Sequence, residues 1–515
     1  MNVEDLYWFS FTLVTIVSYF TFKLLTRYRD FFTVRGVAFE KPHFIYGNLN
    51  DVLSGKISSL ELIQQFYRKF ENARIFGFYN YLSPAFYIRD PELIEKLWVQ
   101  EGAHFANHGY FLDESKDTIL GNQLHLLKDK KWSQMRCTLG AVLSTQTVTS
   151  MTSLIRTNSI DLVDYLKSSS NTEMEFKEVA LKHTFNVVAS CAFGVKLNTF
   201  TDENDKLCHV GYSVMYGNNP VQTFKTMLFY LFPKVMSKMN VQLMEASHSK
   251  YFLSLLKSAT KNHHQKNTNR SSVIQLLNQA TQGELRVDEG ERAYLQIKDV
   301  ATRTWSDEEL VAQCVAFFGS SFESMVNLIS FACYELAANP NIQQKLLEEI
   351  RSSLKDGPLT YETVNEITYL DMVVCETLRK WPASPSCDRE CSQDYLLAQD
   401  DLRLQFRKGD SLWVSVWAMH RDERYFPDPE RYDPERFGET RKGEIRANTY
   451  LPFGIGQRNC IGRRLALLVV KITLVDLIQN FQLNLGSKLK EPLRLAKASF
   501  ALEPDGGFWL QLTHR

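Results

Sequence analysis

The sequence lacks an excess of charge of either sign. Its 515 residues include 59 Lys and Arg against 59 Asp and Glu, so the formal net charge at pH 7 is zero. Binding to nucleic acid depends on basic side chains that neutralise phosphates. The composition therefore argues against a nucleic-acid-binding protein.

Glycine and proline are also few, at 24 and 15 residues, which excludes a fibrous or low-complexity protein. Hydrophobic residues make up 44% of the chain and aromatic residues 12%, which is ample material for a large core. No linker rich in glycine, proline or serine divides the chain, and no internal repeat is visible. We therefore expect one large globular domain, although a prior of about 150 residues per domain would suggest three.

The nine cysteines are odd in number, and most are dispersed without a repeated spacing. Secreted disulfide frameworks use even numbers of cysteines at regular spacings. The pattern therefore argues against a disulfide framework and for a reducing compartment. The cysteines are Cys137, Cys191, Cys208, Cys314, Cys333, Cys375, Cys387, Cys391 and Cys460.

One long apolar run stands near the N-terminus, from Leu6 to Leu25, with Lys23 as its only charge. Its length is about that of a helix that crosses a bilayer. A cleaved signal peptide would have a basic start and a small-residue cleavage site, whereas Glu4 and Asp5 precede this run and no such site follows. Basic residues after the run place the rest of the chain in the cytosol. We expect a membrane anchor at residues 1–29 and a catalytic domain at 30–515, with a buried core helix as the alternative for the run.

The rest of the chain reads as mainly helical. The stretch from Asp307 to Ala338 contains no proline, and Ser306 with Glu309 makes a capping box at its start. Its central residues are apolar or small on every side, which predicts a helix that passes through the core. We expect a mainly α fold with a small β component. The strand-like runs are Ile75–Ile88, Tyr395–Leu404, Ser411–Val416 and Phe508–Leu512.

The strongest candidate site lies near the C-terminus, in the segment PFGIGQRNCIG from Pro452 to Gly462. Gly454 and Gly456 allow a tight loop that can lie flat against a planar ligand, and Phe453 can shield the sulfur of Cys460 from water. An apolar helix follows at once, and a helix N-terminus stabilises a thiolate. A lone cysteine is often only a small buried hydrophobic residue. This combination, however, is what a haem-iron thiolate ligand requires.

The run Phe453 to Gly462 resembles the haem-binding signature of the cytochromes P450, and further motifs stand in the order of that family. Glu376-Thr377-Leu378-Arg379 is similar to the family's ExxR motif, and Pro434–Phe437 is similar to its PxRF segment. Glu376 and Arg379 are three residues apart, so they share a helix face and can pair. The resemblance implies that Arg436 is the second cation of this structural group.

Trp132 and Arg136 resemble the WxxxR motif of the family's C helix, whose members hydrogen-bond a haem propionate. The resemblance implies the same role for them and for Arg458. It also implies haem b as the cofactor and Cys460 as the axial ligand of its iron. The cofactor-binding residues implied in this way are Cys460, Trp132, Arg136, Arg458, Phe453, Gly454 and Gly462.

Within the family, three stretches resemble insect microsomal members allied to the vertebrate drug-oxidising enzymes. They are the opening RGVAFEKPHFIYGN, the phrase YELAANPNIQQKL and the ending GGFWLQL. The chain is most similar to the ninth insect family. The resemblance extends over essentially the whole chain.

The predicted central helix departs from the family pattern. The usual sequence is Ala/Gly-Gly-x-Asp/Glu-Thr, whereas this chain has Ser320-Ser321-Phe322-Glu323-Ser324. The resemblance implies catalytic roles for Glu323, which passes protons inward, and for Ser324, which donates a hydrogen bond to the reacting oxygen. Ser321 replaces glycine, and its hydroxymethyl group is expected to crowd the oxygen pocket or recruit a water there. Ser386 stands near a propionate-binding arginine of related enzymes.

The resemblance implies a haem-thiolate monooxygenase that inserts one oxygen atom of O2 into lipophilic substrates. Xenobiotics such as insecticides and plant toxins fit this class, as do insect hormones and lipids. Electrons would come from NADPH through NADPH-cytochrome P450 reductase, with cytochrome b5 as an optional second donor. The expected location is the endoplasmic reticulum membrane with the catalytic domain facing the cytosol. Candidates for a basic face that binds the reductase are Lys130, Lys131, Arg463, Arg464 and Lys471.

Two other functions fit the same motifs. The first is a haem-thiolate isomerase or dehydratase that needs neither O2 nor a reductase, and the retained Glu323 and Ser324 argue against it. The second is a poorly coupled haem protein that sequesters lipophiles, which Ser320 and Ser321 favour.

Overall fold

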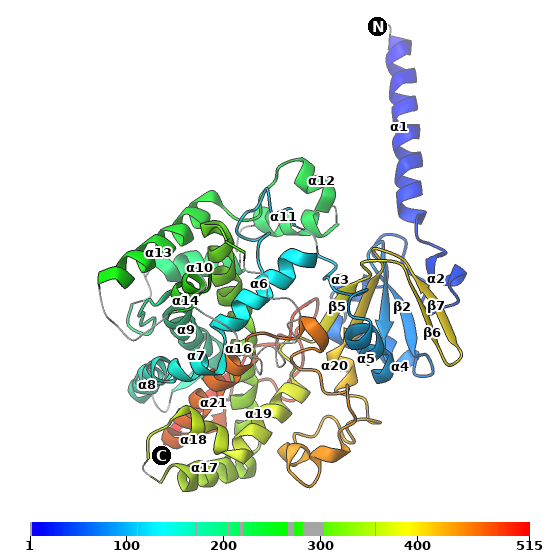
Figure 1. Ribbon diagram of the computed structural model, residues 1–515. Helices are drawn as coiled ribbons and strands as arrows, with labels where there is room; N and C mark the ends of the chain where they lie inside the picture. The colour runs from blue at the N-terminus through cyan, green and yellow to red at the C-terminus, as the bar shows by residue number, and fades with distance from the viewer. Residues whose placement is uncertain are drawn as a thin grey trace.

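The computed structural model describes residues 3–110, 112–169, 172–202, 206–216, 220–231, 233–265, 272–281, 303–355 and 357–515. A helical body fills one side of the molecule and a smaller part that contains most of the strands fills the other (Figure 1). Helix α1 (Val3–Thr26) projects away from both parts. The architecture is mainly helical, which confirms the predicted fold class.

The described helices and strands are distributed along the whole chain. The helices after α1 are α2 (Phe31–Val34), α3 (Asn50–Leu53), α4 (Ser59–Lys69), α5 (Pro91–Glu95), α6 (Asp129–Val142), α7 (Thr145–Ser150), α8 (Thr152–Ser168), α9 (Phe176–Val188), α10 (Lys206–Tyr216), α11 (Pro220–Leu231), α12 (Pro233–Lys238), α13 (Ala246–Gln265), α14 (Val273–Thr281), α16 (Asp307–Ala338), α17 (Pro340–Leu354), α18 (Tyr361–Glu366), α19 (Thr368–Lys380), α20 (Val416–Met419) and α21 (Arg463–Asn480). The strands are β1 (Ala38–Phe39), β2 (Ile75–Asn80), β3 (Ser83–Ile88), β4 (Glu173–Glu175), β5 (Ser386–Glu390), β6 (Tyr395–Gln399), β7 (Leu402–Phe406), β8 (Ser411–Ser415), β9 (Phe481–Leu485) and β10 (Trp509–His514).

Within the described residues the strands form three small sheets. The largest has the order β1-β2-β3-β8-β5, with β1 parallel to β2, β3 parallel to β8, and the other two pairs antiparallel. The others have the orders β4-β10-β9 and β6-β7. All four strand-like runs predicted from the sequence contain strands. Strand β5 was not predicted, because its sequence SCDRE is mostly polar and its pairing with β8 depends on tertiary contacts.

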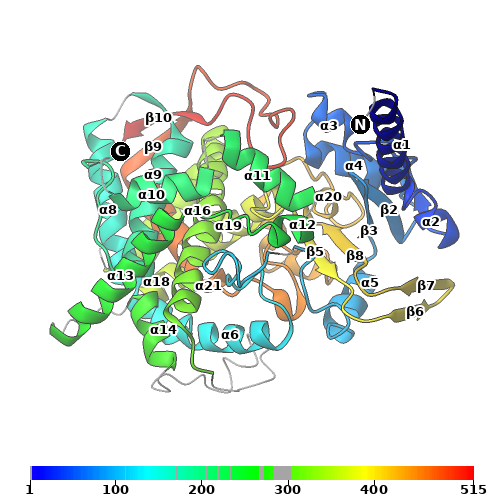
Figure 2. The same ribbon diagram turned by 90° about the horizontal axis from the view of Figure 1, so that it is seen from above.

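Helix α16 runs through the centre of the helical body (Figure 2). Its bounds are those predicted, and the capping box is formed: the Ser306 side chain accepts from the Glu309 amide, and the Glu309 carboxylate accepts from the Ser306 amide. The 32 residues span about 48 Å. The helix packs against α9, α19, α21 and β9, and it contributes to the largest hydrophobic cluster of the protein.

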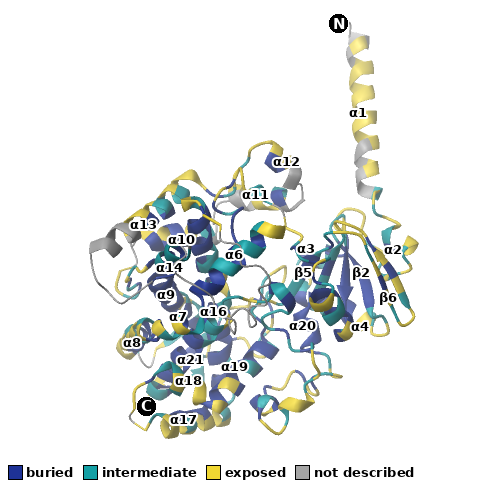
Figure 3. Ribbon diagram, viewed as in Figure 1, coloured by how far each residue is buried: buried dark blue, intermediate teal, exposed yellow. Residues whose placement is uncertain are grey.

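Helix α1 presents apolar side chains along its exposed length (Figure 3). Tyr7 and Trp8 are 73% and 70% exposed, values that are unusual for large apolar residues of a folded protein. By length and composition, one helix of the described residues could cross a membrane, namely α16, and it is mostly buried in the core. In α1 the described side chains form a shorter apolar stretch, Tyr7–Tyr19.

The base of α1 is fixed to the part that contains the largest sheet. Four residues separate α1 from α2, and Phe32 of α2 is fully buried with its ring centre 5.3 Å from that of Phe86 and 5.1 Å from that of Tyr79. A Cβ atom at Gly77 would lie 2.6 Å from the Phe32 ring, so a residue with a side chain at position 77 would displace Phe32. The start of the catalytic part is therefore held by aromatic packing.

A buried ion pair joins α19 to the segment before the cysteine loop. The Arg379 guanidinium donates to the Glu376 carboxylate at 2.7 Å and 2.9 Å, and both side chains are fully buried. Arg436 lies 3.5 Å from the same carboxylate and donates to the carbonyl of Pro427 at 2.6 Å. Arg379 also donates to the carbonyl of His420 at 3.0 Å. The group therefore fixes the path of residues 420–436 against α19.

Replacing Arg379 is expected to destabilise the protein strongly. In Arg379→Met the buried Glu376 carboxyl loses both hydrogen bonds from Arg379 and keeps only Arg436 as a cation, 3.5 Å away. Breaking a buried pair in this way costs about 3–5 kcal/mol. The free energy of unfolding, measured by circular dichroism in urea, should fall by that amount. The control is Arg441→Met, which removes the more exposed 2.8 Å pair with Asp433 and should cost less than about 1 kcal/mol. Equal losses in the two variants would contradict this prediction.

Candidate active site

The loop Pro452–Gly462 presents Cys460 at the N-terminal end of α21. The Cys460 amide donates to the carbonyl of Phe453 at 2.8 Å, which folds the loop back on itself. Gly456 has φ +73°, and a Cβ atom there would lie 2.2 Å from the carbonyl oxygen of Trp98. Only glycine fits this close approach, so the loop is locked against the chain that follows α5.

Cys460 is exposed, although protein atoms surround it closely. Desolvation by these atoms raises the pKa of its thiol. The amides of Gly462 and Arg463 and the positive charges of Arg136 and Arg463 act in the opposite direction. The expected lowering of the pKa by the helix N-terminus is thus present but weaker than the effect of burial. A bound metal ion would reverse this balance by favouring the thiolate.

Part of α16 is accessible in the same way. Ser320 and Glu323 are exposed and Ser324 is half-buried, in the middle of a helix that is otherwise largely buried. Residues at i, i+3 and i+4 share one face of a helix. The acid and the alcohol predicted as catalytic therefore lie together on an accessible polar face of the core helix.

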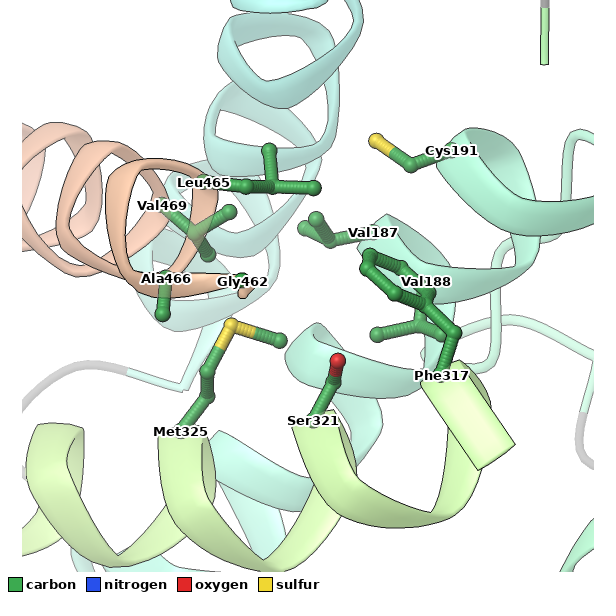
Figure 4. A pocket seen from close by; sticks show the side chains of 10 residues that line it. All are labelled: Val187, Val188, Cys191, Phe317, Ser321, Met325, Gly462, Leu465, Ala466 and Val469. Atoms are coloured by element: carbon green, nitrogen blue, oxygen red, sulfur yellow. The ribbon is translucent and has the colours of Figure 1, made fainter. Parts of the chain in front are cut away.

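Ser321 points in a different direction from Ser320 and Ser324. It lines a pocket between α9, α16 and α21, together with Gly462 of the cysteine loop and Ala466 of α21 (Figure 4). Its hydroxyl is the one side-chain oxygen of this pocket and makes no hydrogen bond to a described residue. The other residues that line the pocket are Val187, Val188, Cys191, Phe317, Met325, Leu465 and Val469.

Arg136 and Arg458 are buried next to the cysteine loop. Arg458 donates to the carbonyls of Ala106 at 2.7 Å and Leu127 at 2.9 Å, and its guanidinium lies 3.9 Å from the centre of the Trp132 ring. Arg136 donates to the Asn459 carbonyl at 2.9 Å and to the Asn459 side chain, while its buried Nε makes no hydrogen bond. The Trp132 indole N–H makes no hydrogen bond to a described residue either.

A third buried guanidinium, that of Arg389 on β5, lies close to the other two. It donates to the Asp388 carbonyl at 2.6 Å and lies 4.5 Å from the centre of the Trp98 ring. Burial and the charges of Arg389 and Arg136 lower the pKa of Arg458 to about 8. Burial and Arg389 likewise lower the pKa of Arg136 to about 10, although Cys460 acts to raise it. The cations are desolvated and repel one another.

Few negative charges oppose this cluster. The carboxylates that act on Arg458 are those of Asp388 and the exposed Asp129. Asp388 is itself engaged, because its carboxylate lies 2.8 Å from His108 Nδ1 and accepts from the Gly109 amide at 2.8 Å. Three buried cations beside one thiol therefore form a site for an anionic ligand.

Comparison with known proteins identifies the chain. The family model for cytochrome P450 matches residues 37–510. The chain belongs to the cytochrome P450 family. It is 34% identical to cytochrome P450 9b2 of Drosophila melanogaster over 514 residues, covering 98% of each chain. It is 32% identical to cytochrome P450 9e2 of Blattella germanica, covering 100% of this chain and 99% of the relative.

A more distant relative is the probable cytochrome P450 6a13 of Drosophila melanogaster, which is 30% identical over 97% of this chain and 98% of its own. The resemblance to the ninth insect family is thereby confirmed. The protein is a cytochrome P450 monooxygenase, and members of its family carry haem.

The residues present fit a haem. A haem supplies two carboxylates, which match the excess of buried guanidinium groups and the free Nε of Arg136. A Cβ atom at Gly462 would meet no atom within 4 Å, so this side of the loop is open to a flat ligand. Cys460 supplies an accessible sulfur at the same place. The set Cys460, Arg136, Arg458 and Trp132 could therefore hold the group.

Two of the expected basic residues are not free for a redox partner. Lys131 lies 3.0 Å from the Glu309 carboxylate and equally close to Glu114, and Lys471 is buried with its ammonium 2.9 Å from the Asp371 carboxylate. These two lysines tie α6 and α21 to neighbouring elements, which corrects the expectation of a five-residue basic face. The exposed members of that set are Lys130 and Arg463.

Sequence reasoning missed Arg389 and Asp388 as members of the cation cluster. The pattern predicts an arginine near Ser386, and the structure places one three residues further along the same strand. Alternation in β5 puts Asp388 and Arg389 on opposite faces, yet both are buried, at 6% and 2% exposure.

His420 connects the buried ion pair to the cysteine loop and is expected to make stability depend on pH. Its Nδ1 donates to the Arg379 carbonyl at 3.0 Å and its Nε2 accepts from the Leu451 amide at 2.9 Å, so the folded protein holds it neutral. Burial, with repulsion from Arg379, lowers its pKa to about 3. The unfolded chain binds a proton there below about pH 6.5, so stability is lost as the pH falls from 6.5 towards 3.

In His420→Gln this loss should shrink by up to about 1.4 kcal/mol per pH unit. The measurement is the slope of the unfolding free energy between pH 6.5 and 5. His43→Gln, at an exposed histidine, is measured beside it for comparison. A slope in His420→Gln equal to that of the parent would show that the imidazole is not what acid titrates.

Proposed function

We propose that this cytochrome P450 is a membrane-anchored haem-thiolate monooxygenase that inserts one oxygen atom of O2 into lipophilic substrates. The observation that carries the proposal is the accessible Cys460 beside the buried guanidinium groups of Arg136, Arg389 and Arg458. A thiol alone would not need these cations. A cofactor with an iron centre and two carboxylates uses both.

The chain's share of the reaction begins with binding the cofactor, which we propose is haem b. Cys460 would supply the thiolate ligand of the iron. Arg136, Arg458 and Trp132 would donate to the carboxylates with their N–H groups that make no hydrogen bond to a described residue, and Phe453, Gly454 and Gly462 would line the place of the ring. The haem, when bound, supplies the activation of O2 by two electrons.

Glu323 and Ser324 are proposed to transfer protons to the reacting oxygen. Both lie on the accessible face of α16, so Glu323 can exchange protons with water and Ser324 can donate a hydrogen bond to the reacting oxygen.

Electrons are proposed to come from NADPH through NADPH-cytochrome P450 reductase, with cytochrome b5 as an optional second donor. The exposed Lys130 and Arg463 remain the basic groups available for such an acidic partner. The substrates are proposed to be insecticides, plant toxins, hormones or other lipids, because the family to which the chain belongs acts in general on lipophilic substrates.

The proposed location is the endoplasmic reticulum membrane, with residues 1–29 as the anchor and residues 30–515 in the cytosol. The exposed aromatic and aliphatic side chains of α1 support this location, since water is a poor environment for them. The basic residues after α1 favour the cytosolic side for the rest of the chain.

The alternatives remain a haem-thiolate isomerase or dehydratase, and a haem protein that sequesters lipophiles. Glu323 and Ser324 on one accessible face favour the monooxygenase over the first. NADPH-dependent O2 uptake with added reductase separates the three. Product formed in proportion to the O2 consumed supports the monooxygenase. Product formed without O2 uptake supports the isomerase or dehydratase, and ligand binding without product supports the sequestering protein.

The axial ligand is tested by Cys460→His. A thiolate ligand gives reduced family members a characteristically shifted Soret band with carbon monoxide, so the variant should lose that band completely. Cys375→Ser, at a half-buried cysteine of α19, is the control and should keep it. Persistence of the band in Cys460→His would remove Cys460 from the site.

Ser321→Gly should raise the ratio of product formed to NADPH consumed and lower the release of hydrogen peroxide. The reason is that the Ser321 hydroxyl, which makes no hydrogen bond to a described residue, can hold a water in the pocket beside Gly462. Such a water could deliver a proton to the wrong oxygen atom. Gly in a helix costs about 1 kcal/mol. Ser330→Gly carries the same backbone cost in a fully buried part of α16 and is the control. An unchanged or lower ratio in Ser321→Gly alone would show that Ser321 is only a tolerated substitution.

A further inference from the structure

Polar side chains link helices α8, α9 and α21 in the interior of the protein. Nε2 of His183 on α9 lies 2.8 Å from the Thr473 hydroxyl of α21, and both residues are fully buried. The buried Asp476 carboxylate of α21 lies 3.5 Å from Nε of Arg156 on α8. Burial raises the pKa of Asp476, while Arg156 and Ser159 of α8 lower it. We call these five residues the polar junction.

Several atoms of the polar junction have no hydrogen-bond partner among the described residues. In that part of the chain sixteen buried side-chain N and O atoms make no hydrogen bond, and seven of them belong to α8, α9 and α21. They include Nε of Arg156, Oγ of Ser159 and Oδ2 of Asp476. Ser159 is 0% exposed and Asp476 is 4% exposed. Buried polar groups of native proteins are nearly always paired, and ordered internal water pairs them where the protein does not.

These three atoms match the hydrogen-bonding capacity of water. A carboxylate oxygen such as Asp476 Oδ2 only accepts, the Arg156 Nε–H only donates, and the Ser159 hydroxyl does either. A water among them can therefore make about three hydrogen bonds, as internal waters usually do. A metal cation is a poorer occupant, because the Arg156 guanidinium already lies beside the carboxylate and would repel it.

The inner end of the polar junction lies beside the pocket that contains Ser321. Val187 follows His183 by one turn of α9, and Val469 precedes Thr473 by one turn of α21. Both valines line that pocket (Figure 4). The Thr473 hydroxyl donates to the Val469 carbonyl at 2.8 Å. The polar junction and the pocket are therefore about 5.4 Å apart along the helix axes.

The outer end of the polar junction reaches the surface. The Arg156 side chain is 35% exposed, so its guanidinium meets solvent next to the buried Asp476 carboxylate. Asp476 and Thr473 are three residues apart and share one face of α21. A series of polar groups thus leads from solvent to within one helical turn of the pocket.

We propose that the polar junction binds internal water molecules and passes water between solvent at Arg156 and the pocket beside Gly462. The inference rests on the proposed function, which makes such a route useful. A monooxygenase places one atom of O2 in the substrate, and the other leaves as water after two protons and two electrons have been consumed. Polar lining suits this route to water and makes it unsuitable for a lipophilic substrate.

A crystal structure of the haem-loaded enzyme tests the binding of water. The proposal requires an ordered water within hydrogen-bonding distance of both Asp476 Oδ2 and Ser159 Oγ. In Ser159→Leu the larger side chain should fill this place and remove the water. A direct hydrogen bond between Ser159 and Asp476 in the parent, with no water beside them, would overturn the proposal.

The release of hydrogen peroxide tests the passage of water to Ser321. A water that loses one hydrogen bond binds about fivefold more weakly, so Ser159→Leu should lower the peroxide released per NADPH by about half or more. Ser153→Leu makes the same change on the exposed face of α8 and should match the parent. If Ser159→Leu does not fold, Ser159→Ala removes the hydroxyl without adding bulk, and the same decrease is expected.

Two kinetic results would contradict the passage of water. The first is peroxide release in the Ser159 variant equal to that of the parent and of Ser153→Leu. The second is full additivity of Ser159→Leu and Ser321→Gly in the double variant, because two changes that remove the same water should not add.

Failure of this inference is distinguishable from failure of the proposed function. If the parent enzyme gives no shifted Soret band with carbon monoxide, the haem-thiolate assignment itself is wrong. If that band is present in the parent and in the Ser159 and Ser153 variants alike, the ordered water and the peroxide release judge the polar junction alone.

Discussion

The crowding of buried positive charge around one thiol is the constraint on which the arrangement of this enzyme depends. Arg136, Arg389 and Arg458 are desolvated and repel one another, so each is held by backbone carbonyls rather than by carboxylates. Carbonyl contacts fix the guanidinium planes without neutralising them. The fold therefore maintains donors in place for an anion, at a cost in stability that the anion offsets when it binds.

The same carbonyl contacts organise the chain around the site. Arg458 donates to carbonyls at both ends of the segment 106–127, and Gln313 attaches that segment to α16. Arg379 and His420 attach the segment before the cysteine loop to α19. Hydrogen bonds to side chains therefore hold the loops that form the site in place, although these loops contain little regular structure.

How much of this could be predicted depends on whether the signal is local. The capping box and the bounds of α16 follow from the residues themselves, because Ser306 and Glu309 interact within one turn. The Glu376–Arg379 pair is equally local. Arg389 was not predicted, since its significance comes from Trp98 and Arg136, which are distant in sequence. The prediction for Lys471 was wrong for the same reason. Its sequence neighbours do not reveal that it is buried and paired with an aspartate of α19.

The short connection between α1 and the packed Phe32 affects how the enzyme meets its substrates. A long flexible tether would let the catalytic part tumble freely beside a bilayer, whereas four residues between α1 and an anchored aromatic side chain act as a stiff joint. With α1 inserted, the catalytic part would keep a restricted tilt and a nearly constant height above the lipid surface. Its substrates would then be captured from one depth of the bilayer, so partition into that layer would become part of the enzyme's selectivity.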